Sequence, residues 1–182
     1  MRDITITAFY TGMRLNELMK LTWRNVDLTT RIITVGDEDF TTKGRNQRYI
    51  PICEEVLAIL SKRLPKVHKV HNEKSYVFCK PNGFPFTGDF ISKMFKRTCK
   101  AAGIDKAIHF HSLRHSFASN LAQRGISLYT IKELLGHSSI STTEIYSHLN
   151  MDSLKEAIKT LDASTSLSTG ASVGLGINKN LI

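Results

Sequence analysis

Short helical patterns, each followed by a glycine, fill much of the C-terminal half of the chain. Apolar residues recur with helical spacing across residues 112–124 and 129–135, and a glycine stands directly after each run. Glycine adopts the left-handed backbone conformation that commonly ends a helix. This half is therefore expected to fold as a series of short helices. Two more are predicted at residues 141–148, with Ser141 as the N-cap, and at residues 151–161.

The N-terminal half adds longer helices and one group of strands. Helical spacing is found at residues 14–23, at 54–64 ahead of Pro65, and at 89–102. Strands are predicted at residues 31–35, and at 40–43 and 47–52, which flank a turn that contains a glycine. Pro51 lacks a backbone donor, which favours an edge position for the last strand. The sequence predicts a mixed α+β fold that is mainly helical, with a small three-stranded antiparallel sheet.

The chain divides into a main domain and a tail. Residues 1–162 are expected to form one domain, and a hydrophobic content of 41% is sufficient for a core. From residue 163 the composition shifts to Ser, Thr and Gly, so residues 163–182 are predicted to be a flexible tail. Residues 4–11 are apolar and follow no cap or turn. A domain that starts in this way is expected to be truncated at its N-terminus.

The charge balance limits the kinds of partner. Lys and Arg number 25 against 16 Asp and Glu, which gives a net charge of +9. This excess favours a polyanion, with nucleic acid first and an anionic membrane surface second. No apolar run reaches the ~18 residues that a membrane-spanning helix needs, so no membrane insertion is expected. The three cysteines lack a CxxC spacing, which favours free thiols in a reducing compartment.

A basic stripe is predicted on the helix at residues 89–102. Its cations fall at positions i, i+3, i+4 and i+7, opposite an apolar face. Such a stripe is either a solvated helix face or a surface that contacts phosphates. The candidate DNA-binding residues are Lys93, Lys96, Arg97 and Lys100, together with Arg45 in the predicted hairpin turn.

Three motifs carry side chains with chemical potential. They are TGMRLNEL at residues 11–18, HSLRH at 111–115, and LGHSS followed by TTEIY between 134 and 146. Each has an ordinary explanation when taken alone. Arg14 and Glu17 could form a surface ion pair, and Tyr146 could be a packing residue. His111 and His115 have the i, i+4 spacing of zinc ligands, but no Glu stands between them as in HExxH.

Together and in this order, the motifs resemble those of the tyrosine recombinases, also called phage-type integrases. The resemblance runs from about residue 5 to about residue 160. It implies a mostly helical catalytic domain with a small antiparallel sheet, and Glu17 as the acidic partner of the first catalytic Arg. The catalytic residues that it implies are Arg14, Lys43, His111, Arg114, His137 and Tyr146.

This set suits phosphoryl transfer. The guanidiniums of Arg14 and Arg114 can bind the non-bridging phosphate oxygens, where negative charge develops. Tyr146 would be the nucleophile, and the surrounding cations are expected to lower its pKa. His111 could accept the Tyr146 proton, and the resemblance assigns Lys43 as the acid for the leaving oxygen. No metal, cofactor or ATP is implied, and His115 and His148 are taken as structural.

The resemblance also implies partners and a setting. The expected partner is double-stranded DNA, and the full-length family members act as tetramers on two duplexes. The chain is expected to be missing the family's N-terminal DNA-clamping domain, so by itself it is expected to be a monomer. A bacterial or phage-encoded cytoplasmic protein associated with the nucleoid is expected. Three alternatives remain: a type IB topoisomerase, a helix-turn-helix DNA binder built on residues 126–149, and a zinc-dependent nuclease.

Overall fold

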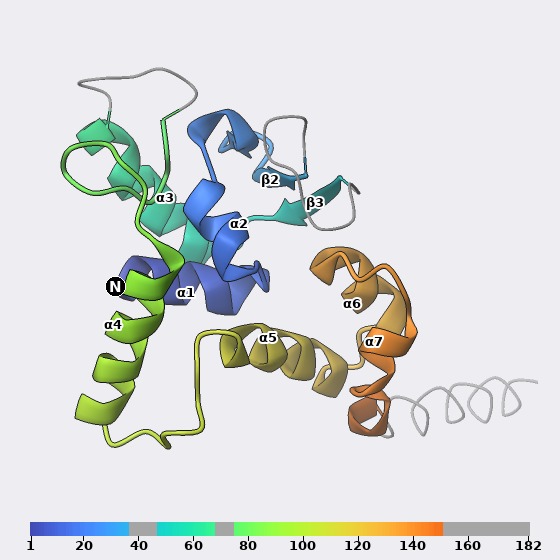
Figure 1. The fold of residues 1–182 in the computed structure, drawn as a ribbon. Coiled ribbons are helices and arrows are strands. Elements are labelled where there is room, and N and C mark those ends of the chain that lie inside the picture. The colour runs from blue at the N-terminus through green and yellow to red at the C-terminus, as the bar shows by residue number, and fades with distance from the viewer. Residues whose placement is uncertain (37–46, 68–74, 151–182) are drawn as a thin grey trace, which may run out of the picture.

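A computed structural model describes residues 1–36, 47–67 and 75–150. This part of the chain is mainly helical and carries one three-stranded antiparallel sheet, so the predicted fold class is confirmed (Figure 1). The helices are α1 (Arg2–Thr11), α2 (Leu15–Lys20), α3 (Glu54–Val67), α4 (Gly88–Ala101), α5 (Ser112–Gln123), α6 (Leu128–Leu135) and α7 (Ser141–Glu144). Two 3-10 turns, η1 (Trp23–Asn25) and η3 (Ser147–Asn150), and the strands β1 (Val26–Asp27), β2 (Ile32–Val35) and β3 (Arg48–Pro51) complete it.

The sheet has the order β1-β2-β3, with Val26 opposite Ile33 and Ile33 opposite Ile50. Pro51 therefore lies in an edge strand, as predicted. The third strand differs from the expected one, because β1 lies before β2 and the predicted strand at 40–43 falls outside the described residues. A tight turn makes the β1–β2 pairing possible, since the Asp27 carboxylate accepts the backbone N–H groups of Thr29 and Thr30.

The predicted helix at residues 14–23 is shorter than expected. It begins at Leu15 and ends at Lys20, and Trp23 lies in the separate turn η1. Before it, α1 ends at Gly12, whose φ of 63° is left-handed. A Cβ atom at this position would lie 2.5 Å from the Phe117 ring of α5. The break at Gly12 thus lets α1 and α5 pack closely together.

Two predicted helix ends are also wrong. Helix α3 continues to Val67, past Pro65, which stands near its end and removes only one backbone donor. Helix α7 begins at Ser141 and ends at Glu144, and Ile140 rather than Ser141 occupies the N-cap position. The predicted helix at 141–148 is therefore divided between α7 and η3.

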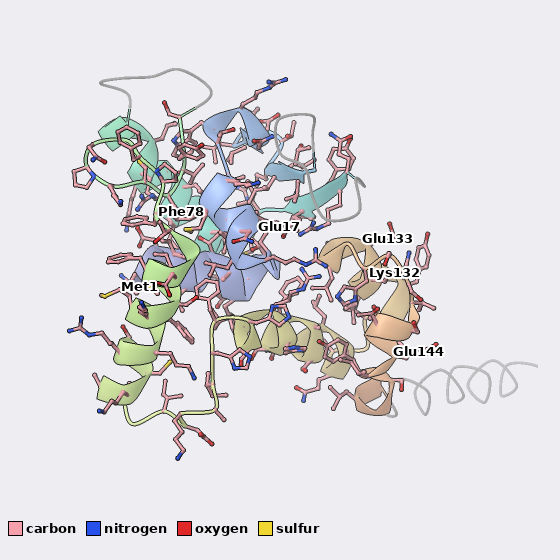
Figure 2. The ribbon with its side chains drawn as sticks, in the orientation of Figure 1. Met1, Glu17, Phe78, Lys132, Glu133 and Glu144 are labelled. Atoms are coloured by element: carbon pink, nitrogen blue, oxygen red, sulfur yellow. The ribbon has the colours of Figure 1, made fainter. Side chains whose placement is uncertain are left out.

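The buried residues form two clusters. The larger one packs the sheet against α1–α4 and includes Leu18, Ile33 and Leu60. Phe78, which Figure 2 labels, belongs to the same cluster. The smaller one lies among the C-terminal helices and comprises Ala118, Ala122, Ile131, Leu135 and Tyr146. The Tyr146 side chain is thus a core member of the C-terminal helical part, where α5, α6 and α7 lie together (Figure 1).

Several sequence predictions lie outside the described residues. They are the helix at 151–161 and the tail at 163–182, so the domain boundary stays a prediction. All three cysteines carry free thiols, as predicted. In the part of the chain that the structure describes, no helix is long and apolar enough to cross a membrane.

Candidate active site

Arg114 lies at the centre of the candidate site, near the start of α5. Only 3% of it is exposed. Its Nη1 donates to the Gly12 carbonyl at 2.7 Å, and its Nη2 donates to the Leu135 carbonyl at 2.6 Å. Burial, and then the charge of Arg14, lower the pKa of Arg114 to about 9, so it stays protonated at neutral pH. The guanidinium is fixed between the ends of α1 and α6.

Arg14 and Glu17 form the start of α2. Arg14 is the N-cap residue rather than a helical one, and its backbone N–H donates to Glu17 Oε2 at 2.7 Å. Its Nη1 donates to Glu17 Oε1 at 3.1 Å. Glu17 itself is buried and projects from α2 near the centre of the molecule (Figure 2). The ordinary surface pair considered from the sequence is therefore half buried, with one fixed carboxylate.

Arg48 is a member of this group that the motifs do not indicate. Its two terminal nitrogens donate to the two Glu17 oxygens at 3.1 and 2.7 Å, and its Nε donates to the Leu134 carbonyl at 2.9 Å. The sequence carries one signal for it, because Arg48 is in phase with the buried Ile50 in an alternating strand. Arg48 thereby links the sheet to both α2 and α6.

The Glu17 carboxylate is ionised in this setting. Its burial alone would raise the pKa, but the hydrogen bonds and charge of Arg48, with those of Arg14, hold the pKa of Glu17 below its usual value. A buried carboxylate with four donors keeps both arginine side chains in place. Glu17 therefore contacts Arg14 through both its backbone and its side chain.

His137 follows the glycine that ends α6. Its Nδ1 lies 2.9 Å from the hydroxyl of Thr143, which is completely buried. Burial, followed by the charges of Arg114 and Arg14, lowers the pKa of His137 to about 4. The imidazole is therefore neutral at neutral pH. If Nδ1 accepts the Thr143 hydroxyl proton, Nε2 carries the ring proton.

Tyr146 is buried against the same group. Only 5% of it is exposed, and its hydroxyl lies 2.7 Å from Nδ1 of His115. Burial raises the pKa of Tyr146, and the opposing effect of Arg114 does not reverse this. The expectation that cations would lower this pKa is wrong, because the cost of burying a phenolate outweighs their attraction. His115 was expected to be only structural, but its Nδ1 contacts the Tyr146 hydroxyl.

His111 lies at the edge of the site. It precedes α5, and its ring meets the His115 ring edge-on with centroids 5.0 Å apart. Burial, and then the charges of His115 and Arg114, lower the pKa of His111. His111 also lines a cavity of about 220 Å³, which it shares with Met13, Leu15, Phe110 and Lys96.

The predicted basic stripe on α4 is present, but two of its four cationic side chains have partners within the chain. Arg97 and Lys100 are exposed, and the opposite face buries Ile91, Phe95 and Cys99. Lys93, however, forms an ion pair with Asp89 at 2.8 Å, and Lys96 Nζ donates to the Lys106 carbonyl at 2.6 Å. Lys43 and Arg45 lie outside the described residues, so their roles stay predictions.

A metal site has little support among the described donors. No group of three or more His, Cys, Asp and Glu side chains in that part of the chain could hold a metal ion. Nδ1 of His115, one of the two histidines considered as zinc ligands, already lies against the Tyr146 hydroxyl. A zinc ion here would need other ligands than those that the structure describes.

Comparison with known proteins decides the family. The model of the phage integrase family matches residues 2–153. The chain belongs to this family. The resemblance to tyrosine recombinases is thus confirmed.

This integrase-family chain is similar to several recombinases. It is 35% identical over 169 residues to tyrosine recombinase XerC of Pediococcus pentosaceus, which covers 87% of this chain and 54% of that protein. The crystal structure of XerA recombinase matches with a TM-score of 0.69 and 32% identity, over 86% of this chain and 56% of that one. XerH site-specific recombinase bound to difH substrate matches with a TM-score of 0.69 and 29% identity, over 86% and 45%. The chain spans about half the length of the curated relatives it matches.

Proposed function

We propose that this chain is the catalytic portion of a site-specific DNA recombinase or integrase. It cleaves and rejoins DNA strands through a covalent 3′-phosphotyrosyl intermediate on Tyr146, without metal or ATP. One observation carries the proposal. Three segments that are distant in the sequence bring Arg14, Arg114, His137 and Tyr146 together, because Arg114 is bonded to the Gly12 and Leu135 carbonyls and its neighbour His115 contacts the Tyr146 hydroxyl.

The arginines supply the phosphate clamp. Two backbone carbonyls fix Arg114, which leaves further N–H groups of its guanidinium for phosphate oxygens. Glu17 holds Arg14, whose side chain is 37% exposed. Donors that are in place before the reaction stabilise the developing charge without reorganisation. Neutral His137 adds a ring N–H donor to the same phosphate.

The nucleophile and the acid complete the reaction. The Tyr146 oxygen attacks phosphorus, and the bond to the 5′ oxygen of the next nucleotide breaks. Lys43 is proposed to give a proton to that oxygen. The phosphotyrosyl ester conserves the bond energy, so the reverse attack by a 5′ hydroxyl reseals the strand.

The proposed partner is double-stranded DNA, and support comes from the similar structure of the Tn1549 transposon integrase in complex with circular intermediate DNA. The exposed part of the α4 stripe and Arg45 are proposed to contact its phosphates. In a full-length protein, four copies would act on two duplexes, whereas this chain alone is proposed to be a monomer. Its place of action would be the bacterial cytoplasm, at the nucleoid.

Covalent trapping tests the function. The 182-residue chain is incubated with nicked duplexes. Cleavage near the nick frees a short fragment that carries the new 5′ hydroxyl, and this fragment diffuses away. A protein–DNA adduct is expected for the wild type and for the control Tyr129→Phe, which changes a 64% exposed tyrosine of α6. No adduct is expected for Tyr146→Phe, which removes only a hydroxyl group. An adduct that persists in Tyr146→Phe contradicts the assignment.

The alternatives predict different outcomes. A type IB topoisomerase would form the adduct and also relax supercoiled plasmid that carries no recombination site. A helix-turn-helix binder would bind DNA with no adduct. A zinc-dependent nuclease would cut without an adduct and stop on addition of a chelator, whereas EDTA is expected to leave the recombinase reaction unchanged.

A further inference from the structure

Among the residues that the structure describes, His115 is the polar partner of the Tyr146 hydroxyl. Its Nδ1 lies 2.7 Å from the Tyr146 oxygen, and the two ring centroids are 6.2 Å apart. We propose that His115 is the base that takes the proton from Tyr146 during strand cleavage. This inference rests on the proposed function of Tyr146 and adds a catalytic residue to it.

Geometry favours His115 over His111 for this task. Both project from the start of α5, and their rings meet edge-on. Only His115 is within hydrogen-bond distance of the phenol oxygen in the described structure, which is the first requirement for a base. A base is needed, because a buried, neutral phenol does not ionise unaided at neutral pH.

The described partner of Nδ1 of His115 is the Tyr146 hydroxyl. Among the described residues, the charged and titratable groups that face His115 are His111 from the start of α5, Arg114 beside it, His137 after α6 and Tyr146 after α7. None of these described groups is a carboxylate. In this proposal the two neighbouring residues have separate tasks. Arg114 binds the phosphate, and His115 receives the proton.

The proposed step is balanced. The proton of the Tyr146 hydroxyl moves to Nδ1 of His115, which requires the tautomer with hydrogen on Nε2. The phenol oxygen forms its bond to phosphorus as the bond to the 5′ oxygen breaks, and that oxygen receives a proton from the leaving-group acid. On rejoining, His115 returns its proton to the Tyr146 oxygen as the phosphotyrosyl bond breaks.

Single-turnover cleavage of the nicked duplex tests the proposal. His115→Asn places an amide near the position of Nδ1 and keeps a hydrogen-bond partner for Tyr146, but it cannot take a proton. Cleavage is expected to slow by about 10²–10⁴-fold. The control Asn120→Ala changes the same helix, where the side chain donates to the Ser116 carbonyl at 2.8 Å, and it should cleave normally. Near-normal cleavage by His115→Asn overturns the proposal.

The pH profile and chemical rescue separate a base from a structural residue. When the cleavage rate is measured between about pH 5 and 9, the wild-type rate should decrease toward low pH as the base becomes protonated. This decrease should be absent in His115→Asn. Added imidazole should restore part of the rate of His115→Ala and none of Tyr146→Phe. An acid limb that survives in His115→Asn but disappears in His111→Asn assigns the base to His111 instead.

Nitrogen NMR of the free protein tests the proposal without DNA. The Nδ1 signal of His115 is expected to be that of an unprotonated ring nitrogen at neutral pH. A protonated Nδ1 would donate to the Tyr146 oxygen and could not accept its proton, which would overturn the proposal. If the wild type forms no Tyr146-dependent adduct, the proposed function fails. If that adduct forms equally in His115→Asn, only the role of His115 fails.

Discussion

Arg114 is held by two backbone carbonyls before it meets any phosphate. Arg114→Lys keeps the charge but loses the planar fork that reaches both carbonyls. Cleavage should fall by about 10²–10³-fold, as for other preorganised donors. The free energy of unfolding should fall by about 1–3 kcal/mol, because a buried carbonyl loses its donor. Stopped-flow cleavage and urea unfolding measure the two effects. Near-normal cleavage with reduced stability would mean that Arg114 is structural.

At the scale of single residues, the motifs indicate most residues of the candidate site. Arg14, Glu17 and Arg114 could be found because each stands in a recognisable local pattern. Arg48 and His115 could not be assigned, because their partners lie far away in the sequence and only the folded chain brings them together. The predicted direction of the Tyr146 pKa shift is wrong because it, too, depends on the folded chain. Charge can be counted from a sequence, but burial depends on packing.

The junction between α6 and His137 requires a glycine for two reasons. Gly136 has a left-handed φ of 64°, and a Cβ atom there would lie 2.9 Å from Arg48 Cδ and 3.0 Å from its Nη1. Gly136→Ala should therefore cost the strain of a left-handed alanine, about 1–2 kcal/mol, and also displace Arg48. The displacement should add about 1–3 kcal/mol of overpacking to the loss of stability. Cleavage should fall as well, because Arg48 holds Glu17.

Gly103→Ala is the matched control for this junction. Gly103 has a φ of 67°, and no atom lies within 4 Å of an added Cβ. Its substitution should show the backbone strain alone, so the difference between the two variants in urea unfolding isolates the contact with Arg48. Equal losses of stability would show that Arg48 moves aside at no cost.

At the scale of elements, glycines and periodicity are reliable guides here. The helix before Gly136 was predicted within one residue of its observed start, and the hairpin strand β3 was expected at the sheet edge. Two helix ends are predicted wrongly because tertiary packing overrides the local sequence signals. Helix α3 continues past Pro65 while Val56 and Leu60 anchor it in the core, and α7 stops after Glu144 as the chain turns Tyr146 inward.

At the scale of the whole molecule, the net charge of +9 predicts weak DNA binding that depends steeply on salt. Each phosphate that a cation neutralises adds about −0.9 to the slope of log affinity against log salt. Because Arg97 and Lys100 lie exposed on one helix, α4, we expect these 182 residues to contact one face of the duplex with little dependence on base sequence. Fluorescence titration of duplexes at several salt concentrations measures the slope. Tight binding that is insensitive to salt would contradict this expectation.

The α4 stripe allows a test within a single helix. Arg97 and Lys100 are exposed, whereas Lys93 is paired with Asp89 at 2.8 Å. Asp89 competes with phosphate for the Lys93 ammonium. Breaking this ion pair costs free energy, which reduces the net gain from a phosphate contact by Lys93. Arg97→Ala and Lys100→Ala should each make the slope shallower by about 0.9, and Lys93→Ala should change it less. Lys62→Ala on α3, a helix that carries none of the site residues, should leave the slope unchanged. Equal effects of all four substitutions would mean that the protein binds DNA through its net charge and that α4 has no special place in the contact.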